Sequence, residues 1–347
     1  MLSNQTKLKK SLNIIFRVLI IGMTWGYIIR QVFYHREWDD LLPAFSRMMD
    51  HSGWVISSGL VMILMLLNWS LESRKWQFMI GKIEKVSFFR SFQAVLTGVS
   101  ISSFTPNRIG EYFGRVFILD RAGHIEGILI TILGSMSQLM ITLFAGSFAV
   151  VLFLPGYLAG FDEPIFYLYQ GLIVVVVIFD LLLLLLYFNV PVLAGLRERL
   201  LKGKRMEKVR RFFEVLARFS FKDLGRVILL SLVRYGVFTV QYFLLLRIFR
   251  VPVPFTDGVM MISLIFLVLS VIPTIALTEL GVRDSAALFL FGIYFSRDGG
   301  MSDEIRLGIL AASTVLWMVN LAIPAVIGSF FVLRLKFFRK NTHPDPA

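Results

Sequence analysis

Cysteine is absent from this 347-residue sequence, and histidine and charged residues are scarce. Without cysteine there is no disulfide, thiolate metal ligand or thiol nucleophile. The four histidines, at positions 35, 51, 124 and 343, lack the spacing of a metal site. Charged residues make up 17% of the chain, against about 25% in an average soluble domain, and residues 127–160, 258–278 and 307–333 contain none. Uncharged apolar runs of about 18 residues or more indicate membrane spans. The sequence therefore excludes a soluble enzyme and a protein with a single membrane anchor.

Six apolar segments are long enough to cross a membrane, and two more are interrupted. The predicted spans are residues 11–33, 53–71, 126–154, 165–188, 225–248 and 305–333. Two further apolar stretches are broken at Pro106 and at Pro273, and charged residues follow each break. Irregular backbone at membrane depth is tolerated only beside protein or a watery cavity. We therefore predict two re-entrant helical hairpins, over residues 91–119 and 258–295.

The net charge of +13 is explained by basic loops on one side of the membrane. With the N-terminus in the cytoplasm, 25 of the 36 lysines and arginines lie in cytoplasmic segments and 7 in outer loops. This asymmetry follows the positive-inside rule, so we predict that both termini are cytoplasmic. The eleven basic residues of segment 197–226 either set this topology or form an amphipathic helix on anionic lipid. Nothing accompanies them that indicates nucleic-acid binding.

The two halves of the chain repeat the same order of elements in opposite orientation. Residues 1–160 contain two spans, a hairpin and one span, and residues 161–347 contain the same series followed by a basic tail. Inverted repeats of this kind are typical of transporters, whose substrate site lies at discontinuous helices near the midplane. We therefore predict an all-α polytopic membrane protein whose two hairpins meet near the midplane; the alternative is two unrelated kinked helices.

The first break carries charges that suit an anion site. Thr105 before Pro106 predicts the start of a half-helix, whose free N–H groups favour a negative ligand. Asn107 and Arg108 stand at this tip, and Arg108 can donate two hydrogen bonds to a phosphate. Gly110 and Glu111 follow. The alternative is an Arg108–Glu111 ion pair that locks the hairpin and binds nothing.

The second break has a similar pattern. Thr278 is a candidate helix cap, Glu279 and Arg283 are spaced as a helical ion pair, and Gly281, like Gly110, is expected to let the two tips approach closely. Here the alternative is that Glu279 and Arg283 neutralise each other or pair across to Arg108 and Glu111.

A third basic residue, Arg234, lies in the middle of the fifth span. It either lines the same cavity as a ligand for a lipid headgroup or pairs with Asp180 of the fourth span. We expect no catalytic residue, metal or cofactor, because the tips lack a histidine partner for a nucleophile and the chain has no glycine-rich phosphate loop.

Two motifs resemble those of the lysylphosphatidylglycerol synthase transmembrane (flippase-like) family. They are Thr105-Pro106-Asn107-Arg108-Ile109-Gly110-Glu111-Tyr112 and Glu279-Leu280-Gly281-Val282-Arg283-Asp284. The family usually has glycine at the position of Asn107 and two glycines at Thr278-Glu279, so this chain carries an extra carboxylate. The resemblance implies a bacterial inner-membrane protein, without the synthase domain, that moves a lipid or lipid-linked headgroup between leaflets.

Three functions follow as hypotheses. The leading one is a flippase or transporter with alternating access that holds the phosphate of a membrane phospholipid or lipid-linked anion with Arg108, Arg283 and Arg234. In this hypothesis Glu111 and Glu279 either pair with these arginines in the empty state or attract an amine-bearing headgroup. The second is a membrane-embedded enzyme acting on a lipid phosphate. The third is a scaffold for a separate cytoplasmic synthase or glycosyltransferase. The sequence assigns neither the lipid, the direction, the coupling ion nor the oligomeric state.

Overall fold

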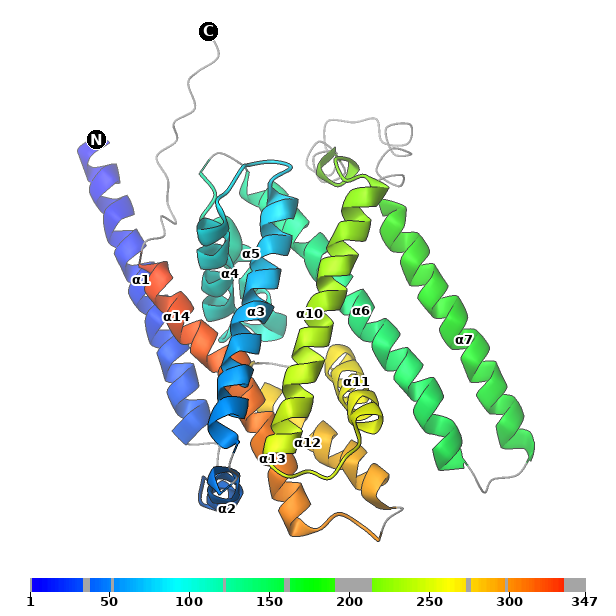
Figure 1. Cartoon of the computed structure of the whole chain (residues 1–347). Coiled ribbons are helices and arrows are strands. Elements are labelled where there is room, and N and C mark those ends of the chain that lie inside the picture. The colour runs from blue at the N-terminus through cyan, green and yellow to red at the C-terminus, as the bar shows by residue number, and fades with distance from the viewer. Residues whose placement is uncertain are drawn as a thin grey trace.

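The computed structural model describes residues 2–33, 38–50, 53–120, 123–158, 163–190, 214–272, 276–296 and 299–333. Within these ranges every regular element is a helix (Figure 1). The elements are α1 (Leu2–Phe33), α2 (Trp38–Met49), α3 (Trp54–Ile80), α4 (Phe88–Ser102), η1 (Pro106–Arg108), α5 (Gly110–Val116), α6 (His124–Leu158), α7 (Glu163–Phe188), α10 (Phe221–Ile248), α11 (Phe255–Val271), α12 (Ala276–Phe295), α13 (Asp303–Trp317), η5 (Met318–Ala322) and α14 (Ile323–Val332).

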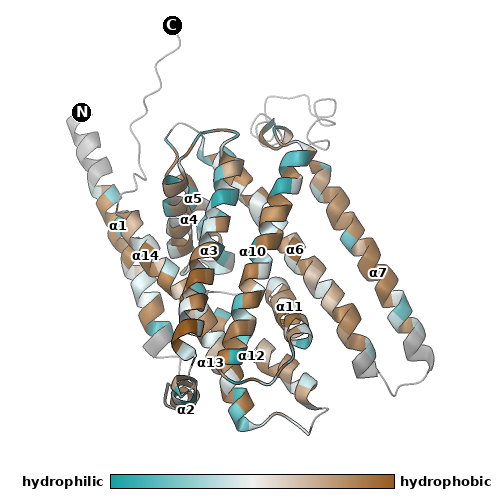
Figure 2. Cartoon of the chain, viewed as in Figure 1, coloured by the Kyte–Doolittle hydropathy of each residue, from teal (hydrophilic) through white to brown (hydrophobic). Residues whose placement is uncertain are grey.

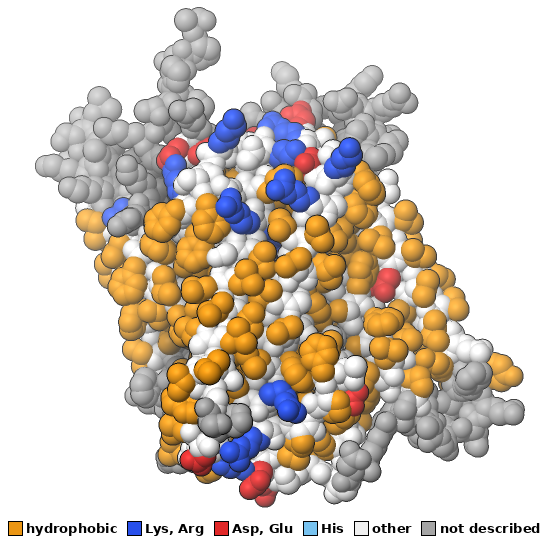
Figure 3. Space-filling model, viewed as in Figure 1, with side chains coloured by type: hydrophobic (Ala, Val, Ile, Leu, Met, Phe, Trp, Pro, Cys, Tyr) orange, Lys and Arg blue, Asp and Glu red, His pale blue; other side chains and the backbone are white. Residues whose placement is uncertain are grey.

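Six helical segments are long and apolar enough to cross a membrane, as the sequence predicts. They are Ser11–Gln31, Trp54–Ile80, His124–Pro155, Tyr167–Phe188, Phe221–Ile248 and Asp303–Val332, the last formed by α13, η5 and α14 together. Figure 2 shows hydrophobic residues along most of their length. Figure 3 shows a broad hydrophobic band on one face of the molecule, with lysines and arginines gathered above it. The protein is therefore a multi-pass membrane protein.

The second span extends beyond its predicted end at residue 71. Helix α3 continues to Ile80 and carries Glu72 and Lys75 into the protein interior, where both are buried. Glu72 and Lys75 are charged, but their side chains face other helices and not lipid. The predicted boundary is therefore wrong by about two turns.

Local sequence explains several helix starts. The hydroxyl of Ser87 accepts a hydrogen bond from the backbone N–H of Arg90 at the start of α4. Ser220 and Asp223 form a reciprocal capping box at the start of α10. Such caps satisfy backbone N–H groups that the first turn leaves free, and typically stabilise a helix by about 1 kcal/mol.

The last span contains a π-helical turn, η5, directly before Pro324. Proline lacks an N–H and its ring crowds the carbonyl four residues earlier, which here belongs to Asn320. The widened turn accommodates that conflict and turns Asn320 into the interior, where its side chain is bonded on two sides. Turns of this type occur frequently at functional sites.

The core lies between α3, α10, α4 and α14, and α7 stands at the rim of the bundle (Figure 1). Only 6% of the apolar window of α7 is buried inside the protein, against 61% of the span formed by α13, η5 and α14. Helix α14 approaches α4 so closely that a Cβ atom added to Gly328 would lie 2.0 Å from the carbonyl oxygen of Leu96. The last helix therefore packs directly against the short helix α4, which in turn contacts α5.

Candidate functional site

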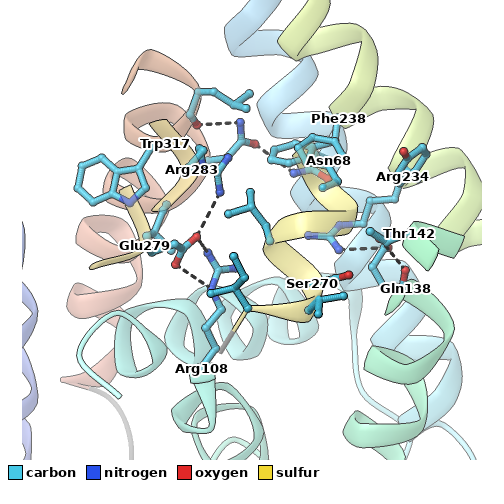
Figure 4. A pocket seen from close by; sticks show the side chains of 18 residues that line it. Asn68, Arg108, Gln138, Thr142, Arg234, Phe238, Ser270, Glu279, Arg283 and Trp317 are labelled. Atoms are coloured by element: carbon cyan, nitrogen blue, oxygen red, sulfur yellow. Dashed lines mark hydrogen bonds and ion pairs between the residues drawn. The ribbon is translucent and has the colours of Figure 1, made fainter. Parts of the chain in front are cut away.

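A cavity of about 570 Å³ lies where the two interrupted segments meet, and four of the predicted site residues line it: Arg108, Arg234, Glu279 and Arg283. Its wall is formed by α3, η1, α6, α10, α11, α12, α13 and η5. The lining residues are Asn68, Arg108, Gln138, Thr142, Arg234, Tyr235, Phe238, Phe266, Leu269, Ser270, Val271, Ile272, Glu279, Arg283, Leu316, Trp317, Asn320 and Leu321. Three arginines and one carboxylate therefore share a cavity whose remaining residues are neutral (Figure 4).

Arg108, Glu279 and Arg283 form one ion cluster that joins η1 to α12. Glu279 Oε1 accepts from Arg108 Nη2 at 2.6 Å and from Arg283 Nη2 at 3.2 Å. Glu279 Oε2 accepts from Arg108 Nε at 3.3 Å. Figure 4 shows the two side chains from the first and second interrupted segments pointing toward one another. The prediction that the charges of both breaks gather in one place is therefore confirmed for these three residues.

Arg108 holds an unusual backbone conformation, with a φ of 55°. A left-handed conformation costs a non-glycine residue about 1–2 kcal/mol, and such outliers concentrate at functional sites. The conformation ends the three-residue turn η1, after which α5 begins at Gly110. The side chain of Arg108 is 44% exposed, so its guanidinium is available to a ligand in spite of its bond to Glu279.

Glu111 does not pair with Arg108, so the alternative of an Arg108–Glu111 lock is wrong. Its carboxylate bonds to Arg115, one turn further along α5. Residues i and i+4 share one face of a helix, whereas Arg108 precedes α5 and its side chain is bonded to α12 instead. Glu111 is also absent from the cavity wall.

Thr105 and Gly110 hold the first turn together rather than lining the cavity. Thr105 Oγ1 accepts a hydrogen bond from the backbone N–H of Gly110 at 2.9 Å and donates to the carbonyl oxygen of Ser102 at 3.3 Å. A Cβ atom at Gly110 would lie 2.6 Å from the carbonyl oxygen of Ile101. The close approach at Gly110 is thus to the end of α4 and not to the second tip.

Gly281 does not provide the close approach that the sequence predicts. A Cβ atom added there would meet nothing within 4 Å, because the tips meet through the longer side chains of Arg108 and Glu279. The side chains of Asn107 and Thr278 lie outside the described residues, so the expectations for these two stay predictions.

Arg234 lines the cavity from α10, on the side away from Arg283 (Figure 4). Its Nη1 lies 3.2 Å from Gln138 Oε1 and 3.3 Å from Glu72 Oε2, and its guanidinium lies 5.5 Å from the ring centre of Trp69. Pairing with Asp180 is wrong, because Asp180 accepts a hydrogen bond from Ser147 of α6 instead. Arg234 therefore lines the same cavity, as the first of the two sequence alternatives requires, and its role as a ligand for a lipid headgroup stays a prediction.

A second ion cluster, which the sequence did not predict, lies behind Arg234. Glu72 of α3 contacts Lys75 Nζ at 2.9 Å, Arg115 Nη1 at 2.8 Å and Arg234 Nη1 at 3.3 Å. The side chains of Glu72, Lys75 and Arg115 are 5% or less exposed. We call Glu72, Lys75, Glu111, Arg115 and Arg234 the Glu72 cluster. A sequence signal could have indicated this cluster: charged residues lie within the same stretch as the apolar Trp69, Trp76 and Met79.

A chain of amides crosses the interior beside the cavity. Asn68 Nδ2 donates to Asn320 Oδ1 at 3.1 Å, and Asn320 Nδ2 donates to Gln241 Oε1 at 2.9 Å. The chain links α3, η5 and α10 and supplies two hydrogen-bonding residues, Asn68 and Asn320, to the cavity wall. Among the residues that the structure describes, no group of histidine or acidic side chains is arranged to hold a metal ion.

The family described as the lysylphosphatidylglycerol synthase TM region matches residues 14–305, which include both clusters and most of the cavity wall. No curated protein matches the chain.

Proposed function

The chain belongs to the lysylphosphatidylglycerol synthase TM-region family, and on that premise we propose that it moves a phosphate-bearing lipid between the leaflets of a bacterial inner membrane. The observation that carries the proposal is the presence of Arg108, Arg234 and Arg283 in one cavity inside an apolar helix bundle. Each charge at membrane depth opposes insertion by about 2.5–3.5 kcal/mol even on the more lenient scale. Such residues mark substrate pathways in membrane proteins, and arginine suits a phosphate ligand.

The proposed architecture is an inverted repeat with two re-entrant hairpins, α4–α5 and α11–α12. Helix α4 has 15 residues and α5 has 7, which correspond to about 22 and 10 Å at 1.5 Å per residue. Neither crosses a hydrocarbon core of about 30 Å. Figure 1 draws α4–α5 and α11–α12 in opposite halves of the bundle, and the Arg108–Glu279 bond joins their tips. This arrangement supports alternating access around a central site.

We propose that the start of α1 and the end of α14 face the cytoplasm. Both lie at the same end of the bundle in Figure 1. Basic residues at that end include Lys82 in the turn after α3, Arg90 in the first turn of α4 and Arg226 near the start of α10, in keeping with the positive-inside rule.

Glu279 acts as an internal counter-ion in this mechanism. In the empty cavity its carboxylate holds Arg108 and Arg283 and so reduces the cost of their burial. An incoming phosphate competes for the same N–H groups. The headgroup then crosses within the cavity while the acyl chains stay in the surrounding lipid.

Transport is tested with purified protein in liposomes that contain a phosphatidylglycerol with a fluorescent label on one acyl chain. An impermeant quencher added outside measures how fast inner-leaflet lipid becomes accessible. The wild type should accelerate flipping, and Arg283→Gln should reduce the rate at least tenfold. Arg306→Ala, on the exposed start of α13, is the matched control and should flip at the wild-type rate.

A wild-type rate for Arg283→Gln would refute the site assignment. Release of a radiolabelled water-soluble headgroup from the same liposomes would instead favour a membrane-embedded enzyme.

A further inference from the structure

We infer that the cavity selects a lipid whose headgroup is net negative and disfavours one that ends in a free amine. The inference rests on the proposed function and specifies its substrate class. It is notable because an amine-bearing headgroup is the one that the family description names. The charges of this chain's own residues carry the argument.

The cavity wall has an excess of positive charge. Three arginines and one glutamate line it, so its formal charge is about +2 by the ordinary ionisation of these side chains. The other lining residues are neutral. In a space of low dielectric constant, such an excess attracts an anion and repels a cation much more strongly than it would in water.

Most of the acceptor capacity of Glu279 is already taken by arginine. Its two carboxylate oxygens accept three hydrogen bonds, two from Arg108 and one from Arg283. The side chain is only 9% exposed. An amine that approached this carboxylate would compete with both arginines and would lie beside their guanidinium groups, which repel it.

Two further carboxylates near the cavity, those of Glu72 and Glu111, are also bonded to basic side chains. Glu72 is surrounded by Lys75, Arg115 and Arg234 and is 5% exposed. Glu111 is bonded to Arg115. Neither glutamate lines the cavity. Within the part of the chain that the structure describes, the acidic side chain in the cavity lining is therefore already bonded to arginine.

Arginine nitrogens, by contrast, are in surplus. Nε and Nη1 of Arg283 and Nε of Arg234 are buried and have no hydrogen-bond partner among the described residues. Buried donors without an acceptor are costly, and phosphate oxygens are strong acceptors for guanidinium groups. Small movements of these side chains toward a phosphate would satisfy the donors.

The rest of the polar wall suits a neutral, hydroxyl-bearing group attached to the phosphate. Asn68, Gln138, Thr142, Ser270 and Asn320 all line the cavity. Asn68 Oδ1 is buried without a donor, so it can accept from a hydroxyl. The volume of about 570 Å³ lies within the range of about 300–1,000 Å³ usual for small-molecule sites. An anionic lipid such as phosphatidylglycerol fits this chemistry.

The test compares three soluble lipids with identical dioctanoyl chains and headgroups of different charge. Phosphatidylglycerol carries −1, phosphatidylcholine is neutral overall, and lysylphosphatidylglycerol carries +1. Isothermal titration calorimetry on the full chain in a neutral detergent measures each Kd. We expect phosphatidylglycerol to bind at least tenfold more tightly than phosphatidylcholine, and lysylphosphatidylglycerol no more tightly than phosphatidylcholine. Lysylphosphatidylglycerol that binds as tightly as phosphatidylglycerol would overturn the inference.

Glu279→Gln provides a second measurement with a nearly isosteric side chain. It raises the formal charge of the wall by one unit, so phosphatidylglycerol should bind several-fold more tightly. Glu304→Gln, at a carboxylate that is 79% exposed, is the matched control and should change nothing. Weaker binding of lysylphosphatidylglycerol to Glu279→Gln, with phosphatidylglycerol unchanged, would show that Glu279 receives the amine and would refute the inference.

The proposed charge selectivity and the proposed transport activity can be refuted independently of each other. If phosphatidylglycerol is preferred but no lipid is flipped in liposomes, the proposed transport is refuted and the charge selectivity stands. If lipids are flipped but the cationic lipid binds best, the charge selectivity is refuted and transport stands.

Discussion

Replacing Glu72 with glutamine should be among the most damaging single substitutions in the chain. The carboxylate contacts three cations at 2.8–3.3 Å and its side chain is 5% exposed. Two unit charges about 3 Å apart attract by about 5–6 kcal/mol at an effective dielectric constant of about 20. Desolvation offsets much of this, at several kcal/mol per ion. Removing one partner of a buried pair typically costs about 3–5 kcal/mol, and we expect a loss of that size.

The measurement is the apparent melting temperature of detergent-solubilised protein, followed by size-exclusion chromatography after heating. A loss of about 3–5 kcal/mol should lower it by about 4–7 °C in a chain of this size. Glu304→Gln removes an exposed carboxylate that pairs with Arg47 at 3.2 Å. Exposed pairs contribute about 0–1 kcal/mol, so this control should melt within about 1 °C of the wild type.

A double variant tests whether the loss of stability comes from the charge balance of the Glu72 cluster or from the changed shape of the side chain. The Glu72 cluster has three cations and two carboxylates, and Glu72→Gln leaves only Glu111 against the three cations. Adding Lys75→Met removes one cation and restores the original formal charge, so the double variant should recover part of the lost stability. A single variant as stable as the wild type, or a double variant less stable than the single one, would refute the reasoning.

Two further predictions concern the backbone. Arg108→Gly relieves the left-handed conformation but removes the guanidinium, so the protein should still fold, and it should flip lipid at least tenfold more slowly than the wild type. Arg250→Gly, at a φ of 58°, is the control and should keep the wild-type flipping rate. Equal rates for the two variants would contradict the role of Arg108. Gly328→Ala would place a methyl group 2.0 Å from the Leu96 carbonyl oxygen and should sharply reduce the folded yield in size-exclusion chromatography. Gly292→Ala, with nothing within 4 Å, should leave the yield unchanged; a normal yield for both would show that α14 and α4 can separate.

The spans could be predicted from the sequence because length and hydrophobicity are local properties. The end of α3 could not, because it depends on whether a charged residue has a partner. Glu72 and Lys75 have the composition of a loop, yet Glu72 pairs with Lys75 and also with Arg115 from α5 and Arg234 from α10. A helix that continues through buried charges is stable only in its tertiary setting.

The same distinction applies to the site. Arg108, Arg234 and Arg283 could be identified because a charge within an apolar segment is costly wherever its partner lies. Their partners could not be identified by spacing. Arg108 bonds to Glu279, which is 171 residues away in the sequence. Glu111, only three residues away, bonds to Arg115 instead. Pairing across helices depends on how the helices pack, which no local pattern contains.

The contact between α14 and α4 also has a consequence for how the chain is assembled. Gly328 lies against Leu96, and Asn320 is bonded to Asn68, so the last span closes structures that are made in the first third of synthesis. At about 5–20 residues per second, the roughly 220 residues between Arg108 and Gly328 take about 10–40 s to appear. For most of that interval the charged turn at Arg108 lacks α12, and for all of it α4 lacks α14. We expect the nascent chain to keep this turn in water, or against another protein, until its own C-terminal helices arrive.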